Sequence, residues 1–339
     1  MLTMQRMTAL RSRGLFAVLL TGLVLAFSSC KKDEDNTPAP PTIYSLISTG
    51  NQFTILKKAL VKAGLNGPLS QPGNLTVFAP TDAAFRAFGY ADTNAINNIP
   101  ATQVPLLVAV LQYHVIGSKV ESSAIPAAVN TPQQTLGGLP LYVTKAASST
   151  TSSATSTSIS VNGARVVSLD GQASNGAVHV IDRVLLPPVL GNIAATLQGI
   201  PTLFPTYSFT FLQAAVAKAG IGGALIANGP LTVFAPTDAA FTAANPNIKT
   251  VEDVNALPAA TLAQILSYHV INNARAYTPL ITNGQSLTTL QGGTITAATS
   301  TTGITVTGRG NNSTASRVIG PDLSATNGVI HVIDRLLLP

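Results

Sequence analysis

The side chains that could carry out chemistry in this chain are few, and the four histidines all lie in repeated positions. Two follow a tyrosine and two lie in an apolar run that closes each repeat: Tyr113-His114, Tyr268-His269, His179 and His331. A metal site or a general base would need a second ligand or carboxylate at a fixed spacing, as in H-E-x-x-H. No histidine has such a neighbour on its own element. We therefore expect buried, hydrogen-bonded roles for the two in apolar runs, and we leave the Tyr-His pairs open between structure and recognition.

The remaining candidates favour structure over catalysis. Asp82 and Asp238 follow a Pro-Thr pair, where a carboxylate suits the first turn of a helix. Two further aspartates adjoin arginines at predicted strand ends, where a solvated ion pair contributes little: Asp182-Arg183 and Asp334-Arg335. The chain contains no G-x-S-x-G, P-loop or G-x-G-x-x-G motif. We expect no catalytic residue, no cofactor and no metal, and hence no enzyme.

One stretch repeats almost unchanged and organises the chain. Leu75 to Phe85 (LTVFAPTDAAF) returns 156 positions later as Leu231 to Phe241. Its β-branched and aromatic alternation predicts a strand, and Pro80 ends that strand because it cannot donate to the ladder. Thr81 then stands at a helix N-cap position. The stretch predicts a tandem duplication in which each copy turns from strand to helix.

Further blocks keep the same order in both copies. Phe53, Leu56 and Leu60 fall on one helical face, and Gly64 follows as the predicted helix stop. The second copy repeats this pattern with Leu212, Val216 and Gly220. A helix over about 103–111 leads into the first Tyr-His pair, and one over 261–266 leads into the second.

Each repeat closes with a long apolar segment that begins at Asn-Gly: Asn175 to Pro187, and Asn327 to Pro339. Asn-Gly predicts a type I′ hairpin turn. The nearly continuous apolar run after it predicts a strand buried on both faces. Two stretches differ between the copies, a Ser/Thr-rich loop at 146–158 and an apolar insertion at 199–208. For Phe204 and Tyr207 in the insertion, local packing is favoured over a domain contact or a binding surface.

The N-terminus predicts an exported lipoprotein. Arg6, Arg11 and Arg13 precede a 13-residue apolar segment, Leu15 to Phe27, which is too short to span a bilayer comfortably and matches a secretory signal. It ends just before Cys30, the single cysteine of the chain. Because one cysteine cannot form an intrachain disulfide, lipidation of Cys30 gives this residue a role. The layout resembles a bacterial lipoprotein signal, with Phe27 where leucine is usual.

Composition limits the partners. Residues 31–41 are charged and then Pro-rich, which predicts a solvated tether. Its acidic cluster resembles the surface-export signal of some Gram-negative lipoproteins. The formal charge is +6, but removing three of the 19 basic residues with the signal leaves 16 against 13 acidic ones. No basic cluster remains, so nucleic acid is not an expected partner.

These blocks identify the family that the chain resembles. Thr76 to Phe85, the first Tyr-His pair and Asn175 to Asp182 are similar to the signature blocks of fasciclin (FAS1) domains, and the second repeat carries all three. The first repeat departs at Asp170-Gly171, where the family usually has Asp-Ile; the second has Asp322-Leu323. The resemblance implies an α+β fold of two tandem FAS1-like domains, each a wedge of two small β-sheets with helices packed around it.

The expected organisation is a lipoprotein signal peptide at 1–29, a tether at 30–41, and FAS1 domains at 42–188 and 189–339. The FAS1 resemblance further implies an adhesion or interaction module. The lipoprotein-like signal predicts that this module is lipid-anchored at the cell envelope, in what we expect to be the outer membrane and exposed at the cell surface. Protein or glycan ligands at the cell surface are the expected partners. By this resemblance the candidate binding residues are Tyr113, His114, Tyr268 and His269.

Two alternatives remain open from the sequence: a glycan-binding surface lipoprotein, and a structural component of a biofilm or matrix. Sugar sites commonly stack pyranose rings on aromatic faces, yet the chain has no tryptophan and only 5% aromatic residues. Four tyrosines are available for such stacking: Tyr44, Tyr90, Tyr142 and Tyr277.

Overall fold

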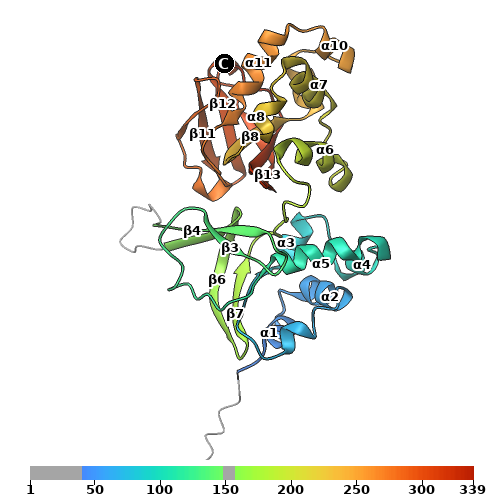
Figure 1. Ribbon diagram of the computed structural model, residues 1–339, viewed down its shortest axis with the longest axis vertical. Coiled ribbons are helices and arrows are strands. Elements are labelled where there is room, and N and C mark those ends of the chain that lie inside the picture. The colour runs from blue at the N-terminus through green and yellow to red at the C-terminus, as the bar shows by residue number, and fades with distance from the viewer. Residues whose placement is uncertain (1–39, 148–156) are drawn as a thin grey trace, which may run out of the picture. The chain divides into compact units, whose positions relative to one another are not determined.

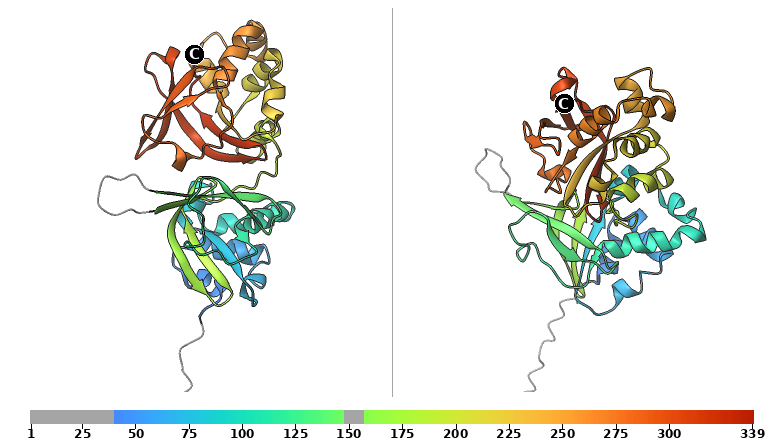
Figure 2. Two further views of the ribbon diagram at one scale, coloured as in Figure 1. Left: turned by 60° about the vertical axis from the view of Figure 1, so that its left-hand side comes forward. Right: turned by 45° about the horizontal axis from the view of Figure 1, so that its top comes forward.

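The computed structural model of the chain describes residues 40–147 and 157–339 (Figure 1). The expected signal peptide, Cys30 and nearly all of the tether lie outside these residues, as does most of the Ser/Thr-rich loop. Within them each repeat forms an α+β domain around one seven-stranded mixed sheet that curls nearly into a barrel (Figures 1 and 2). The predicted α+β fold, with two tandem domains of one topology, is confirmed.

Domain 1 contains, in chain order, α1 (Ile43–Thr49), α2 (Thr54–Lys62), η1 (Pro68–Ser70), β1 (Leu75–Pro80), α3 (Asp82–Ala87), α4 (Thr93–Asn97), η2 (Ala101–Gln103), α5 (Val104–Tyr113), β2 (Val115–Ile116), β3 (Thr131–Gln134), β4 (Pro140–Ala147), β5 (Thr157–Val161), β6 (Ala164–Ala173) and β7 (Gly176–Ile181). Its strand order is β2-β1-β7-β6-β5-β4-β3.

Domain 2 contains α6 (Ile193–Leu203), α7 (Thr210–Ala219), α8 (Gly222–Ile226), β8 (Leu231–Pro236), α9 (Asp238–Ala244), α10 (Val251–Asn255), α11 (Ala259–Tyr268), β9 (Val270–Ile271), η3 (Thr278–Leu280), β10 (Ser286–Thr288), β11 (Thr294–Ser300), β12 (Gly303–Gly308), η4 (Arg309–Asn311), β13 (Ser316–Ala325) and β14 (Gly328–Ile333). Its strand order, β10-β11-β12-β13-β14-β8-β9, matches that of domain 1 read from the other edge.

Long bent strands join the two halves of each wedge. The beginning of β6 pairs with β5, and the rest pairs with β7 through two shifts of register. The bulge places Asp170 at φ 56°, in the left-handed region. In β13 Asp322 has the same conformation, with φ 62°. An irregular strand at this point bends the sheet, so the two small predicted sheets form one continuous curled sheet.

The predicted strand-to-helix corner is confirmed in both copies. β1 ends at Pro80, and the Thr81 hydroxyl accepts a hydrogen bond from the Ala84 N–H as the N-cap of α3. β1 pairs with β2 on one edge and with the parallel strand β7 on the other, and it is buried on both faces. Val77 contributes to the core beneath the helices, whereas Phe78 contributes to the core inside the curled sheet.

Asp82 does more than begin its own helix. Its carboxylate accepts hydrogen bonds from the Ile55 N–H (2.8 Å) and the Thr54 hydroxyl (2.7 Å), at the start of α2. The N-cap of α2 is Phe53, which offers no side-chain acceptor, so Asp82 satisfies donors that the helix leaves free. Asp238 does the same for α7 in domain 2, where it accepts from the Phe211 N–H (2.8 Å). The aspartate therefore joins the corner to the preceding helix.

The predicted Asn-Gly hairpins exist, but the turn lies one residue earlier than expected. Ala173 pairs with Gly176, so Ser174 and Asn175 form the turn and Gly176 is the first residue of β7. A Cβ at Gly176 would lie 1.9 Å from the carbonyl oxygen of Leu75. Glycine is required here because β7 approaches β1 too closely at this point for any side chain.

The asparagine of the same pair ties the hairpin to the helices. Asn175 Oδ1 accepts from the Ile43 N–H (2.8 Å), and Nδ2 donates to the carbonyl of Leu69 (2.9 Å). Asn327 makes the equivalent bonds to Ile193 (2.9 Å) and Leu225 (3.0 Å) in domain 2. In each domain the asparagine amide thus fixes the start of the first helix, α1 or α6, against the terminal strand.

The insertion at 199–208 packs against the core of its own domain, but the Phe204 ring also lies edge-on to Phe88 of domain 1 with 5.7 Å between the ring centroids, so the predicted choice of local packing over a domain contact is not confirmed. Its first part continues α6, which contains Pro201, and Phe204 and Tyr207 lie against the core of domain 2. The Tyr207 hydroxyl donates to the carbonyl of Ile319 (2.9 Å).

No described helix is long and apolar enough to span a membrane.

Candidate functional site

The Tyr-His pairs lie at the junction of the last long helix and the first short strand after it, α5 with β2 and α11 with β9. All four side chains are buried, with exposed fractions of 0–2%. The Tyr113 hydroxyl donates to the carbonyl of Pro140 (2.9 Å) and accepts from Asn162 Nδ2 (2.7 Å). The Tyr268 hydroxyl donates to the carbonyl of Thr294 and accepts from the Arg309 N–H (3.1 Å). The tyrosines therefore close the core inside each curled sheet.

The histidines of these pairs bridge a helix end to the segment that follows the last strand. His114 Nδ1 lies 2.7 Å from the carbonyl of Val110, and its Nε2 accepts from the Leu185 N–H at 2.9 Å. A neutral ring protonated at Nδ1 satisfies both contacts. His269 makes the same two contacts, to the carbonyl of Ile265 (2.8 Å) and the Leu337 N–H (2.9 Å). Burial lowers the pKa of both His114 and His269 to about 4.

These contacts give all four predicted binding residues a structural role. Buried rings with satisfied polar atoms present no side-chain surface to a ligand in the folded domain. Recognition near the Tyr-His pairs stays a prediction, and a partner there would touch the residues that cover them.

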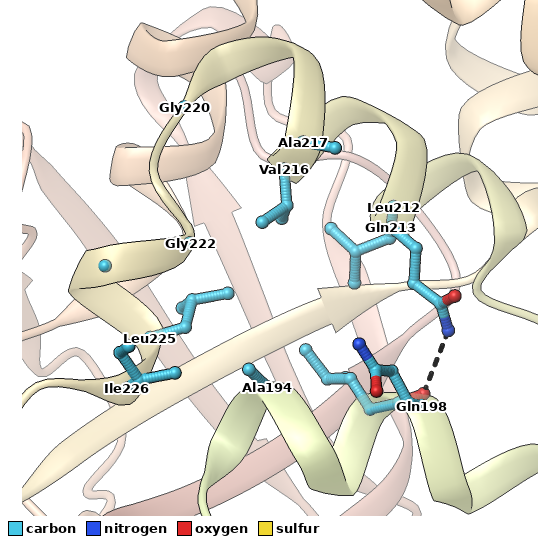
Figure 3. A pocket seen from close by; sticks show the side chains of 12 residues that line it. Ala194, Gln198, Leu212, Gln213, Val216, Ala217, Gly220, Gly222, Leu225 and Ile226 are labelled. Atoms are coloured by element: carbon cyan, nitrogen blue, oxygen red, sulfur yellow. Dashed lines mark hydrogen bonds between the residues drawn. The ribbon is translucent and has the colours of Figure 1, made fainter.

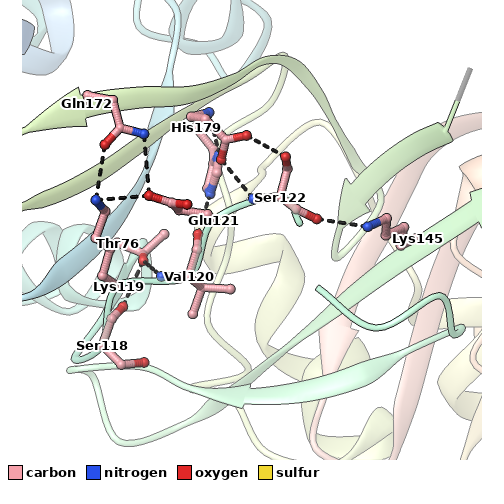
Figure 4. A network of polar contacts seen from close by, with 10 residues as sticks. Thr76, Ser118, Lys119, Val120, Glu121, Ser122, Lys145, Gln172 and His179 are labelled. Carbon is pink, nitrogen blue, oxygen red and sulfur yellow. Dashed lines mark hydrogen bonds and ion pairs between the residues drawn. The ribbon is translucent and has the colours of Figure 1, made fainter. Parts of the chain in front are cut away.

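A second pair of clusters was missed in the sequence, and Figure 4 shows the one in domain 1. Asp170 accepts hydrogen bonds from the Ser122 N–H (2.7 Å) and from the Ser122 hydroxyl. The Asp170 N–H donates to His179 Nδ1 (3.2 Å), and His179 Nε2 lies 2.8 Å from the carbonyl of Val120. The cluster clasps the loop after β2 to the bulge of β6. His179 is fully buried, as predicted.

The residue types of this cluster are those of a hydrolase triad, but the connections are different. In a Ser-His-Asp site the serine hydroxyl donates to the histidine, which takes its proton. Here the Ser122 hydroxyl donates to Asp170, and both nitrogens of His179 are engaged by the backbone. No nitrogen of His179 is left to take the proton of Ser122, so the arrangement differs from that of a Ser-His-Asp site.

Charges around the cluster favour the carboxylate form. Burial by itself raises the pKa of Asp170, but the two hydrogen bonds from Ser122 and the nearby His179 and Lys119 lower it overall. Lys119 also forms a half-exposed ion pair with Glu121 (2.9 Å) and donates to Gln172 (3.0 Å). Such a pair is a solvated contact of small energetic value.

Domain 2 repeats the clasp with one conservative change. The Thr278 N–H donates to Asp322 (2.7 Å), the Asp322 N–H donates to His331 Nδ1 (3.2 Å), and His331 Nε2 faces the carbonyl of Ala276 (2.9 Å). Burial lowers the pKa of His331, although the nearby Asp322 opposes this. Asp170 and Asp322 are thus equivalent, and domain 1 departs from the family pattern only at the residue that follows. The shared spacing of aspartate and histidine, nine residues in both copies, was the signal available in the sequence.

Among the residues that the structure describes, no three His, Cys, Asp or Glu side chains gather as a metal ion would require. Of the tyrosines available for sugar stacking, Tyr277 is 1% exposed and so offers no face to a sugar. Tyr44, Tyr90 and Tyr142 are half-buried.

Sequence comparison agrees with this architecture. The model of the Fasciclin domain family matches residues 51–187 and 207–339. The chain belongs to the fasciclin family, with two tandem FAS1 domains.

Relatives occur in animals and in cyanobacteria. Transforming growth factor-beta-induced protein ig-h3 of Sus scrofa is 28% identical over 281 residues, covering 81% of this chain and 36% of that protein. Protein sll1483 of Synechocystis is 31% identical over 153 residues, covering 45% of this chain and 77% of that protein. The chain thus spans about a third of the length of ig-h3. A solved FAS1 domain pair from the insect cell adhesion molecule Fasciclin I aligns over 84% of this chain and 97% of its own, with 19% identity and a TM-score of 0.39.

Proposed function

We propose that this protein is an adhesion or interaction module of the cell envelope, anchored by a lipid on Cys30, whose FAS1 domains bind extracellular or surface proteins. FAS1 domains are associated with cell adhesion and extracellular interactions in characterised relatives. Because the Tyr-His pairs are buried, the proposed contact surface consists of the residues around them.

One observation carries the proposal: the same exposed leucine lies beside the Tyr-His pair in both domains. Leu136 is 53% exposed, and its N–H donates to the carbonyl of Val115 (2.8 Å), directly after His114. Leu290 is 41% exposed, and its N–H donates to the carbonyl of Val270 (2.7 Å), directly after His269. A single exposed leucine needs no explanation, but its return at an equivalent place in two diverged copies does.

The turn that carries each leucine is held rigidly. Thr135 donates its hydroxyl across the turn to the carbonyl of Leu139 (2.7 Å), and Thr289 does the same to Gly293 (2.9 Å). A Cβ at Gly137 would lie 3.4 Å from the Tyr113 backbone nitrogen, so the turn packs directly on the Tyr-His pair. A turn whose backbone is held by such contacts loses little further backbone freedom when a partner covers it, which favours binding.

The test compares binding to matrix and cell-surface proteins by the purified full chain, with Cys30→Ser to remove the lipid. Leu136→Ser with Leu290→Ser should reduce binding at least tenfold and leave the unfolding midpoint unchanged. Val167→Thr is the matched control, because Val167 is 60% exposed on β6. Equal losses in the control and the double variant, or undiminished binding by the double variant, would refute the assignment. Binding to glycans alone would favour the sugar-binding alternative.

The anchor is tested separately. A fatty-acid probe should label the protein expressed in a bacterial host, and Cys30→Ser should abolish the label. Persistent labelling of that variant would reject Cys30 as the lipidation site. Protease treatment of intact cells decides whether the domains face the outside.

A further inference from the structure

Domain 2 contains a pocket of about 560 Å³ between α6, α7 and α8 (Figure 3). Its walls are apolar and come from all three helices: Ala194, Leu197, Leu212, Val216, Leu225 and Ile226. The volume lies within the range of small-ligand sites, roughly 300–1,000 Å³.

Because the chain is a duplication, each residue that lines this pocket has a counterpart in domain 1. The Ile43 N–H donates to Asn175 Oδ1, and the Ile193 N–H donates to the equivalent Asn327 Oδ1. These two bonds are equivalent, so Ile43 at the start of α1 corresponds to Ile193 at the start of α6. The next residue is Tyr44 in domain 1 and Ala194 in domain 2. Domain 2 therefore lacks a phenol ring that domain 1 carries.

Tyr44 packs against a core cluster that contains the counterparts of the pocket walls. Tyr44 is half-buried and packs against the helical core of domain 1, which includes Leu56, Leu60 and Leu69. At the offset of the repeat these are the counterparts of three pocket walls, Leu212, Val216 and Leu225. Because the Tyr44 ring packs on this cluster, it is the side chain of domain 1 suited to cover the surface that is open in domain 2.

The rim of the pocket has also lost charge. Lys57 donates from Nζ to the carbonyl of Ser48 (3.2 Å) in domain 1. Gln213 and Gln198 replace this lysine and serine, and Gln213 Nε2 donates to the carbonyl of Leu197 (3.3 Å). Figure 3 shows both amides at one end of the pocket, where they can exchange hydrogen bonds with a hydroxyl group. Ile226, which is 57% exposed, replaces Ser70 at the other end.

We propose that this pocket binds a phenolic ring from outside the domain, in the place that Tyr44 takes in domain 1. The aromatic face packs on the leucines and Val216, and the hydroxyl meets the amides of Gln198 and Gln213. The ring comes either from a tyrosine of a partner polypeptide or from a free phenolic compound. This site is separate from the leucine turns and does not depend on them.

The experiment titrates the purified full chain with p-cresol and follows amide resonances by two-dimensional NMR. The Gly220, Gly222 and Gly223 signals should shift together with the side-chain amides of the two glutamines. Ala194→Tyr, which supplies the ring from within, should weaken p-cresol binding at least tenfold. Tyr44→Ala should add a second set of shifts around Gly64 in domain 1.

Several results would overturn the proposal. Unmoved pocket resonances at saturating p-cresol, equal affinity in a folded Ala194→Tyr variant, or equal affinity for cyclohexanol would each do so. If Ala194→Tyr does not fold, a folded Tyr44→Ala variant that also carries Ser48→Gln and Lys57→Gln decides the question, because it recreates the domain 2 lining in domain 1, and no gain of a site there rejects the proposal. An acetylated tyrosine amide that binds at least tenfold more tightly than p-cresol would assign the ring to a polypeptide. Equal or weaker binding would assign it to a free phenol.

Discussion

Acid should destabilise domain 1 through His114, by an amount that follows from its burial. The pKa of His114 is lowered to about 4 in the fold, against an ordinary value of 6.5. As the pH falls below 6.5 the unfolded chain takes up a proton that the folded domain refuses, so stability is full above that pH and declines toward pH 4. With those two pKa values, the loss at pH 5 relative to pH 8 is about 2 kcal/mol, and it approaches about 3 kcal/mol near pH 4.

The assay is native-state hydrogen exchange of domain 1 amides between pH 8 and pH 5, corrected for intrinsic exchange. The Leu185 amide is the most direct reporter because its N–H donates to His114 Nε2. His114→Gln removes the titrating ring and should flatten the pH dependence by about 2 kcal/mol, although it lowers stability at pH 8. Other titrating groups remain in the variant, so their contributions cancel in the comparison.

His269→Gln is the matched control, because His269 makes the same contacts in domain 2. It should leave the pH dependence of domain 1 exchange unchanged and flatten that of domain 2. The reasoning is refuted if the ring proton of His114 titrates near pH 6.5 in the folded protein. It is equally refuted if His114→Gln retains the full pH dependence.

Three further predictions concern domain 2, each measured as the free energy of unfolding in urea. Asp238→Asn should cost about 1–3 kcal/mol, because the Phe211 N–H loses its charged acceptor; an unchanged midpoint would reject the capping role. Gly328→Ala should cost more than about 3 kcal/mol, since its Cβ would lie 2.2 Å from a backbone oxygen, whereas Gly223→Ala, with open space around it, should be tolerated. Tyr268→Phe should cost about 1–3 kcal/mol, because the Arg309 N–H and the Thr294 carbonyl lose their partner; full stability would show that the hydroxyl contributes nothing.

The sequence by itself determined the duplication, the β-to-α corners and the order of the blocks. The duplication and the order of the blocks are properties of the sequence itself, and the β-to-α corners depend on interactions between residues close in the chain. Pro80 ends a strand and Thr81 caps a helix through contacts within three residues, so their roles are visible in any local window. The buried strands after the Asn-Gly pairs were predictable for the same reason, since a continuous apolar run excludes a solvated face.

Only the tertiary structure decided which polar residues are buried and what they hold. Asp82 reaches α2, 27 residues away, and His114 reaches Leu185, 71 residues away, so neither partner is visible in a local pattern. The sequence favoured structure for the Tyr-His pairs but left recognition open, because an aromatic ring and an imidazole serve both. Burial gives these side chains their hydrogen-bond partners within the fold, since enclosed polar atoms must be paired there. The exposure of Leu136 and Leu290 and the pocket beside Ala194 depend on the tertiary structure, because residues far apart in the chain set them.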